Sequence, residues 1–168
     1  MILPRYRSGG SYGIYALAFP AFLRHLVAMI DELYSREILR RTTQLQNVGH
    51  LANPQATADR VAKLCGSTIH VELNMDGEVI TDFAQQVQAC ALGQASAAIV
   101  SQHIIGATGD EVLEARDALR NLLKGEAVDF PERFADLAIL SSVKDYPARH
   151  ASTLLALEAT SAAISSLK

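Results

Sequence analysis

Residues 67–77 read STIHVELNMDG and contain the clearest structural pattern in the chain. Apolar and polar residues alternate over 67–75, which predicts a strand with one buried face and one face in solvent. The Asp-Gly dipeptide at 76–77 tolerates the positive φ angles of a tight hairpin turn. We therefore expect the returning strand over 79–89, and the pattern of 57–64 favours a third antiparallel strand.

Helical periodicity dominates the rest of the chain. Thr108 and Glu111 have the spacing of a capping box, and Lys124-Gly125 is a typical helix end, so a helix is expected between them. Further helices are expected over residues 30–45, 91–105, 132–142 and 148–166. Strands followed by helices indicate an α+β fold, in which helices cover a small antiparallel sheet of about three strands.

Composition excludes several classes of protein. The chain has 168 residues, enough for one domain, and 49% of them are hydrophobic, which excludes an intrinsically disordered chain. The formal net charge of −3 argues against a nucleic-acid binder that neutralises phosphates. Two cysteines are too few for a disulfide-built secreted scaffold or for a four-thiolate metal site within one chain.

The first thirty residues differ from the remainder, because they contain no Asp or Glu. Their apolar run, 13–23, is shorter than the roughly 20 residues of a membrane-spanning helix. A secretory signal is one alternative, but Arg24 lies where small neutral residues would be needed for cleavage. We favour Met29 as the natural start, which makes 1–28 an N-terminal extension and 29–168 the folded domain of a cytoplasmic protein.

Few residues of this sequence can carry chemistry. Cys65 lies in a turn before the clear strand, and Cys90 lies where the returning strand meets a helix. Free backbone N–H groups at a helix start favour a thiolate, so Cys90 is expected to be the more reactive of the two. Small buried hydrophobic residues and a reversible redox pair are the alternatives for the two cysteines. His150, at the start of the last helix, is the histidine that we consider as a metal ligand.

Four segments, in this order, resemble the NifU/IscU-type iron–sulfur cluster assembly scaffolds, especially the SufU-like branch. They are QNVGHL at 46–51, CGS at 65–67, ACALGQASA at 89–97 and VKDYPAR at 143–149. The order and spacing of the segments carry the resemblance, since none of them is specific alone. The resemblance implies the strands-then-helices fold that is expected from the periodicity.

The resemblance also implies a site of three cysteines and one aspartate at one end of the sheet. Cys65 and Cys90 match the first two cysteines of the family. Ser67 stands at the position of the aspartate, and Ser152 stands at that of the last cysteine. His150 can compensate only in part, because two residues along a helix turn a side chain by about 200° around the axis. The expected metal-site residues are therefore Cys65, Cys90, Ser67, Ser152 and His150.

By resemblance, the chain is a scaffold in which Cys65 and Cys90 accept sulfur or bind iron, zinc or a nascent iron–sulfur cluster. The implied partners are a cysteine desulfurase and acceptor apoproteins, and a homodimer can share one cluster. No turnover of a substrate is implied, so we expect no enzyme, and neither nucleic acid nor a membrane is an expected partner. The alternatives are a degenerate homologue that acts as a protein-binding module, and a thiol-redox protein.

Overall fold

The computed structural model describes residues 35–167, so the expectations for residues 1–28 lie outside the described residues and stay predictions. Its elements, in chain order, are α2 (Arg36–Thr42), β1 (Ala56–Ala62), β2 (Ser67–Asp76), β3 (Val79–Gln88), α3 (Ala91–His103), α4 (Gly109–Leu123), the 3₁₀ helix η2 (Glu132–Asp145) and α5 (Pro147–Ser165). The strands precede the large helices, and this order confirms the predicted α+β class.

The sheet is antiparallel with the order β1-β2-β3, so the clearest strand of the sequence is central. Val71 in β2 faces Ala58 in β1 and Gln85 in β3. The predicted hairpin is present, since Asp76 pairs with Val79 and Gly77 adopts a φ of 57°. Glycine is favoured there because a side chain at positive φ is strained.

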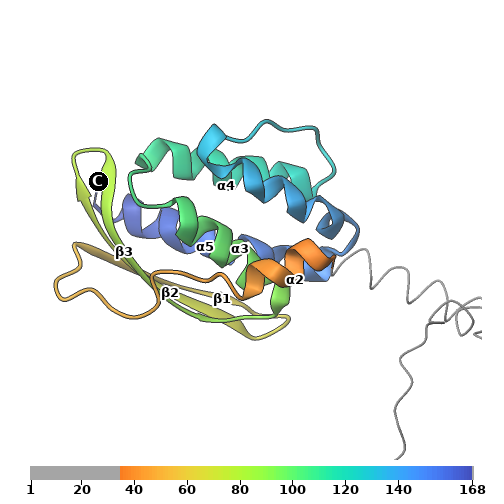
Figure 1. The fold of residues 1–168 in the computed structure, drawn as a ribbon, viewed down its shortest axis with the longest axis horizontal. Helices are drawn as coiled ribbons and strands as arrows, with labels where there is room; N and C mark the ends of the chain where they lie inside the picture. Colours follow the sequence, from red (N-terminus) through yellow and green to blue (C-terminus); the bar gives the residue numbers. More distant parts are fainter. Residues whose placement is uncertain (1–34, 168) are drawn as a thin grey trace, which may run out of the picture. The chain divides into compact units, whose positions relative to one another are not determined.

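Helices cover one face of this sheet (Figure 1). α5 packs against β1 and β2, and α3 packs against α5 and β3. Ile69, Val71 and Leu73 point to these helices and are almost fully buried. α3 is buried nearly all round, and its Ala- and Ser-rich sequence lets the surrounding elements approach closely. α4 and η2 pack against each other and complete the helical layer.

The helix α2 ends earlier than predicted. The pattern predicted a helix over 30–45, of which residues 30–34 lie outside the described residues, and the Ser35 hydroxyl at the start of α2 accepts a hydrogen bond from the N–H of Ile38. α2 ends at Thr42, where the hydroxyls of Thr42 and Thr43 donate to carbonyls of the last turn. Such side-chain bonds compete with the backbone ladder and favour a helix end. Leu45 therefore belongs to the following loop.

The later helices agree closely with the sequence pattern. Thr108 and Glu111 form the predicted capping box of α4, with the N–H of Thr108 donating to Glu111 Oε2 at 2.7 Å. The helix expected over 132–142 is present as η2, which is a 3₁₀ helix interrupted at Phe134. None of the helices in the described residues is long and apolar enough to cross a membrane.

The loop between α2 and β1 is fastened to the edge of β3. The backbone N–H of Gln85 donates to the carbonyl of Asn47, and the N–H of Gly49 donates to the carbonyl of Gln85. The fully buried Gln85 side chain also donates to the carbonyl of Gln46 at 2.9 Å. These bonds fix the segment that leads to His50, so the loop has a defined path along the sheet.

Candidate functional site

Cys65 and Ser67 come from the turn that joins β1 and β2. The N–H groups of Cys65 and Gly66 both donate to the carbonyl of Ala62, which closes the turn. Gly66 adopts a φ of 69°, a conformation that glycine accepts without strain. Ser67 is the first residue of β2 and is buried. The Cys65 sulfur lies 3.1 Å from the Ser67 hydroxyl oxygen.

Cys90 contacts Ser67 through its backbone. It is the N-cap residue of α3, as the sequence predicted, and its backbone N–H donates to Ser67 Oγ at 3.3 Å. Because the Ser67 oxygen accepts this bond, its own proton is free to point at the Cys65 sulfur. Ser67 thereby links the two cysteines through one hydroxyl group.

The last helix completes the group through Ser152. The Cys90 thiol lies 3.5 Å from Ser152 Oγ, and the Ser152 hydroxyl donates to the carbonyl of Arg149 at 2.9 Å. Gly93 permits this approach, because a Cβ atom on it would lie 3.0 Å from the carbonyl oxygen of Ser152. The structure thus brings together four of the five expected residues, from the β1–β2 turn, the start of α3 and the first turns of α5.

The hydroxyl of Ser67 lowers the pKa of Cys65 below its usual value. The backbone N–H of Ser67 acts in the same direction, whereas partial burial of the thiol opposes it. Smaller favourable effects come from the Ser152 hydroxyl and the Arg149 charge. The sequence pointed to the helix start at Cys90 as the source of thiolate character. In the structure the lowered pKa is that of Cys65, which lies beside a hydroxyl that accepts a hydrogen bond from the N–H of Cys90.

His150 is oriented differently from the other four residues. Its Nε2 atom lies 3.1 Å from the carbonyl oxygens of both Val143 and Lys144. A nitrogen between two carbonyl acceptors carries a proton and has no lone pair for a metal. Only Nδ1 of this ring can serve as a ligand, so the role of His150 stays a prediction.

The two thiols and two hydroxyls suit a soft metal ion that binds reversibly, rather than a structural metal site with four strong ligands. Both cysteines are free and partly exposed. The hydroxyls of Ser67 and Ser152 are neutral and already take part in hydrogen bonds. A tetrahedral metal centre needs four ligands, and thiolates are far stronger ligands than hydroxyls. One chain therefore supplies two strong ligands, and the remaining ligands must come from elsewhere.

Comparisons with known proteins show the family to which the chain belongs. The family described as "NifU-like N terminal domain" matches residues 33–153, which is more than half of the chain. The chain belongs to this family. The matched range contains Cys65, Ser67, Cys90 and Ser152, so all four residues of the candidate site lie within the NifU-like region.

Individual proteins of similar sequence or structure also point to this family. The crystal structure of the N-terminal part of a nitrogen-fixing NifU-like protein from Brucella abortus is 48% identical, covers 82% of this chain and 95% of that one, and has a TM-score of 0.78. The zinc-dependent sulfurtransferase SufU of Bacillus subtilis is 26% identical over 73% of this chain and 82% of that protein. The iron–sulfur cluster assembly scaffold protein IscU of Thermotoga maritima is 26% identical over 70% of this chain and 82% of that protein.

A second cluster of polar residues in this NifU-like chain was not predicted from the sequence. His50, His70 and Glu72 place their ligand-type atoms within 4.8 Å of one another. The available signal was the spacing of His70 and Glu72, because residues two apart on a strand share a face. His50 could not be assigned to that face from a local pattern, since it comes from the preceding loop.

Proposed function

We propose that this NifU-like protein is an iron–sulfur cluster assembly scaffold that receives sulfur and iron at Cys65 and Cys90. The single observation that carries the proposal is that the Cys65 thiol and the backbone N–H of Cys90 meet at the Ser67 hydroxyl, in a chain of this family. Iron, sulfur and the nascent cluster are cargo in this function. A weak and open ligand set suits cargo, because a scaffold must release what it builds.

Sulfur acceptance is supported at Cys65, whose lowered pKa increases the thiolate fraction near neutral pH. The proposed donor is a persulfide on a cysteine desulfurase. The Cys65 thiolate attacks the outer sulfur of that persulfide, a new S–S bond forms, and the bond within the donor persulfide breaks. The donor cysteine leaves as a thiolate, so no external oxidant or reductant is consumed.

Two chains together supply the four thiolates that an iron–sulfur cluster commonly uses. We therefore propose that cluster binding brings two copies of the chain together, and that an acceptor apoprotein replaces their thiolates with its own. In this proposal, sulfur transfer and cluster assembly are two stages of one process. The proposal is therefore compatible with both kinds of relative, one named a sulfurtransferase and the other a scaffold.

Anaerobic reconstitution tests the proposal. The wild-type protein is incubated with ferrous iron, cysteine, a cysteine desulfurase and dithiothreitol, which reduces the transferred persulfide sulfur to sulfide, then separated by gel filtration and analysed for iron and acid-labile sulfide. We expect iron and sulfide to elute together with a two-chain species. Cys65→Ser and Cys90→Ser should each lose most of both. Leu64→Ser, which changes an exposed neighbour in the same turn, is the matched control and should retain them.

The same experiment separates the alternatives. A protein that binds the desulfurase but gains neither iron nor sulfur is a docking module, and the proposal is then wrong. A protein that forms a reversible Cys65–Cys90 disulfide without metal, and that again gains no iron, is a thiol-redox protein.

A further inference from the structure

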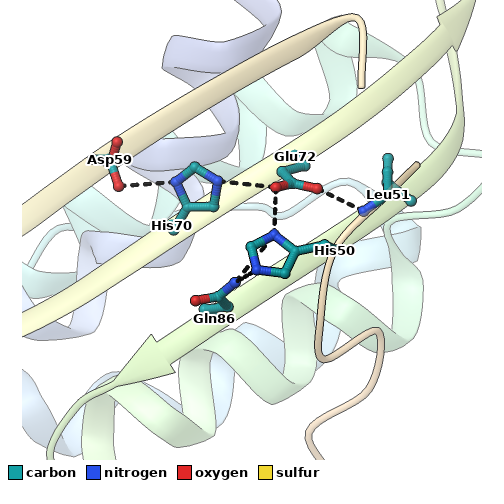
Figure 2. A network of polar contacts seen from close by, with 6 residues as sticks. All are labelled: His50, Leu51, Asp59, His70, Glu72 and Gln86. Atoms are coloured by element: carbon teal, nitrogen blue, oxygen red, sulfur yellow. Dashed lines mark hydrogen bonds and ion pairs between the residues drawn. The ribbon is translucent and has the colours of Figure 1, made fainter. Parts of the chain in front are cut away.

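The face of the sheet opposite the helices carries a compact group of polar side chains (Figure 2). Along β2, Ile69 and Val71 point inward and are buried, so His70 and Glu72 point to the other face. His50 reaches the same face from the loop that is fastened to the edge of β3. The loop and β2 therefore meet at Glu72.

The separations in this group are close to those of metal ligands. His50 Nδ1 lies 2.7 Å, and His70 Nε2 lies 3.2 Å, from the same carboxylate oxygen of Glu72. Ligand atoms around a tetrahedral Zn²⁺ ion are about 3.3 Å apart, because each lies roughly 2.0–2.1 Å from the metal. Small movements are enough to admit an ion, and the exposed His50 ring on its loop can make them.

The atoms of these residues that face away from the centre are held by other groups. His70 Nδ1 lies 2.9 Å from Asp59 Oδ1, so a proton on Nδ1 leaves the Nε2 lone pair directed at the centre. The backbone N–H of Leu51 donates to Glu72 Oε2 at 2.6 Å, so Oε1 faces the two rings. Supporting carboxylates and backbone groups of this kind are typical of metal sites, where they orient the ligands.

The surroundings also provide access and a fourth position. A groove of about 540 Å³, lined in part by Asp59, His70 and Gln86, opens beside the group. The Gln86 side-chain amide contacts both ring nitrogens of His50. A half-turn of that amide exchanges its nitrogen for its oxygen and presents an oxygen ligand. Water entering through the groove is the other source of a fourth ligand.

We propose that His50, His70 and Glu72 form a second metal site, which binds a divalent first-row transition ion such as Zn²⁺. Two imidazoles and one carboxylate suit these ions better than Mg²⁺ or Ca²⁺, which prefer sets of oxygen ligands. This second site is separate from the site that contains Cys65 and Cys90. Ser67 and His70 are three residues apart on β2, roughly 10 Å, and their side chains point to opposite faces of the sheet. The second site therefore does not depend on cluster assembly at the cysteines.

The test removes the thiols and leaves the second site intact. The full chain with Cys65→Ser and Cys90→Ser is titrated with Zn²⁺ by calorimetry, and with Co²⁺ by visible spectroscopy. We expect one ion per chain and a Co²⁺ spectrum without thiolate charge-transfer bands. In this background His50→Gln and His70→Gln should each weaken binding at least about 10-fold, and Asp59→Asn about 10-fold through loss of ligand orientation.

His103→Gln is the matched control, because His103 is also a partly exposed histidine beside a carboxylate, that of Asp136. It should bind Zn²⁺ like the background protein. Thermal unfolding of each metal-free variant verifies its fold, and the exposed position of His50 makes His50→Gln the safest variant. The proposal is overturned if the background protein binds no Zn²⁺, or if folded His50→Gln and His70→Gln bind it as tightly as His103→Gln. Either result leaves the reconstitution test at Cys65 and Cys90 unaffected.

Discussion

Ser67 Oγ lies 3.1 Å from the sulfur of Cys65, and this contact ties the chemistry of the thiol to a residue that is itself not a strong ligand. The oxygen also accepts a hydrogen bond from the first free N–H before α3, that of Cys90. The helix start is therefore connected to Cys65 through Ser67. A single buried hydroxyl therefore links the Cys65 thiol to the backbone N–H of Cys90.

Replacement of Ser67 should make Cys65 less reactive near neutral pH. Ser67→Ala removes the largest cause of the lowered pKa of Cys65, so we expect that pKa to rise. The measurement is the rate of alkylation against pH in a Cys90→Ser background, where Cys65 is the remaining thiol. The midpoint should move to higher pH in Ser67→Ala and stay in place in Leu64→Ala, an exposed neighbour. Identical profiles for all three proteins would show that the hydroxyl has no such effect.

Restoring the implied family ligands should strengthen metal retention. Ser67→Asp with Ser152→Cys adds a carboxylate and a thiolate to the two native thiols, so we expect Zn²⁺ affinity to rise at least about 10-fold. Both serines are buried, so an unpaired carboxylate at position 67 should destabilise the metal-free variant, and metal should restore its stability. Metal content after gel filtration against a chelator measures the gain.

The control for this variant places the new thiol away from the site. Ser67→Asp with Ser166→Cys adds the same groups, but Ser166 is exposed at the end of α5. It should gain clearly less metal than Ser67→Asp with Ser152→Cys, because only its carboxylate reaches the site. Equal gains in both double variants would mean that Ser152 is not part of the site.

The sheet could be predicted from the sequence because the patterns that indicate it lie within short stretches of the chain. The alternation in β2 arises from one buried face, and the hairpin is marked by a dipeptide suited to positive φ. The polar residues near the end of β3 obscured its pattern for a tertiary reason. Gln85 points inward but is satisfied by the carbonyl of Gln46, which belongs to a distant loop. No local rule describes that pairing.

The two candidate sites differ in how far the sequence could predict them. Cys65 and Cys90 were singled out by their positions in the sequence, Ser67 and Ser152 were added through resemblance, and the structure adds the hydrogen bonds that connect them. The second site escaped notice because His50 and Glu72 are 22 residues apart and meet only when the loop crosses the sheet. The fixed path of that loop depends on the edge of β3, which no local pattern encodes.

The stabilising effect of His70 should decrease at alkaline pH. The Asp59 carboxylate raises the pKa of His70 above 6.5, so this stabilisation is fully present below pH 6.5 and is lost as the pH rises through the folded-state value. His70→Gln should therefore cost more stability at about pH 5.5 than at about pH 9, by roughly 1 kcal/mol or less for so exposed a pair. Urea unfolding of metal-free protein at both pH values measures the difference. Asp59→Asn should reduce it, and a loss that is larger at alkaline pH would contradict the assignment.

The contact between Gly93 and Ser152 should make a normally favourable helix substitution harmful. Gly→Ala inside a helix usually stabilises it by up to about 1 kcal/mol. At Gly93 the new Cβ would lie 2.8 Å from Ala89 Cβ and 3.0 Å from the Ser152 carbonyl oxygen, so α3 and α5 must move apart. We expect Gly93→Ala to lose about 1–3 kcal/mol, as in other overpacked cores.

The matched substitution for this prediction is Gly109→Ala, at the start of α4. Its new Cβ would meet methyl groups of Ile164 and Met75, at 3.3 and 3.7 Å, which can shift more easily than a backbone carbonyl. Chemical denaturation should therefore show a clearly smaller loss for Gly109→Ala than for Gly93→Ala. Because Ser152 also contacts Cys90, Gly93→Ala should alter the alkylation rate of Cys90, measured in a Cys65→Ser background, whereas Gly109→Ala should not. A Gly93→Ala protein as stable as the wild type would mean that α3 and α5 are not in close contact at the thiol group.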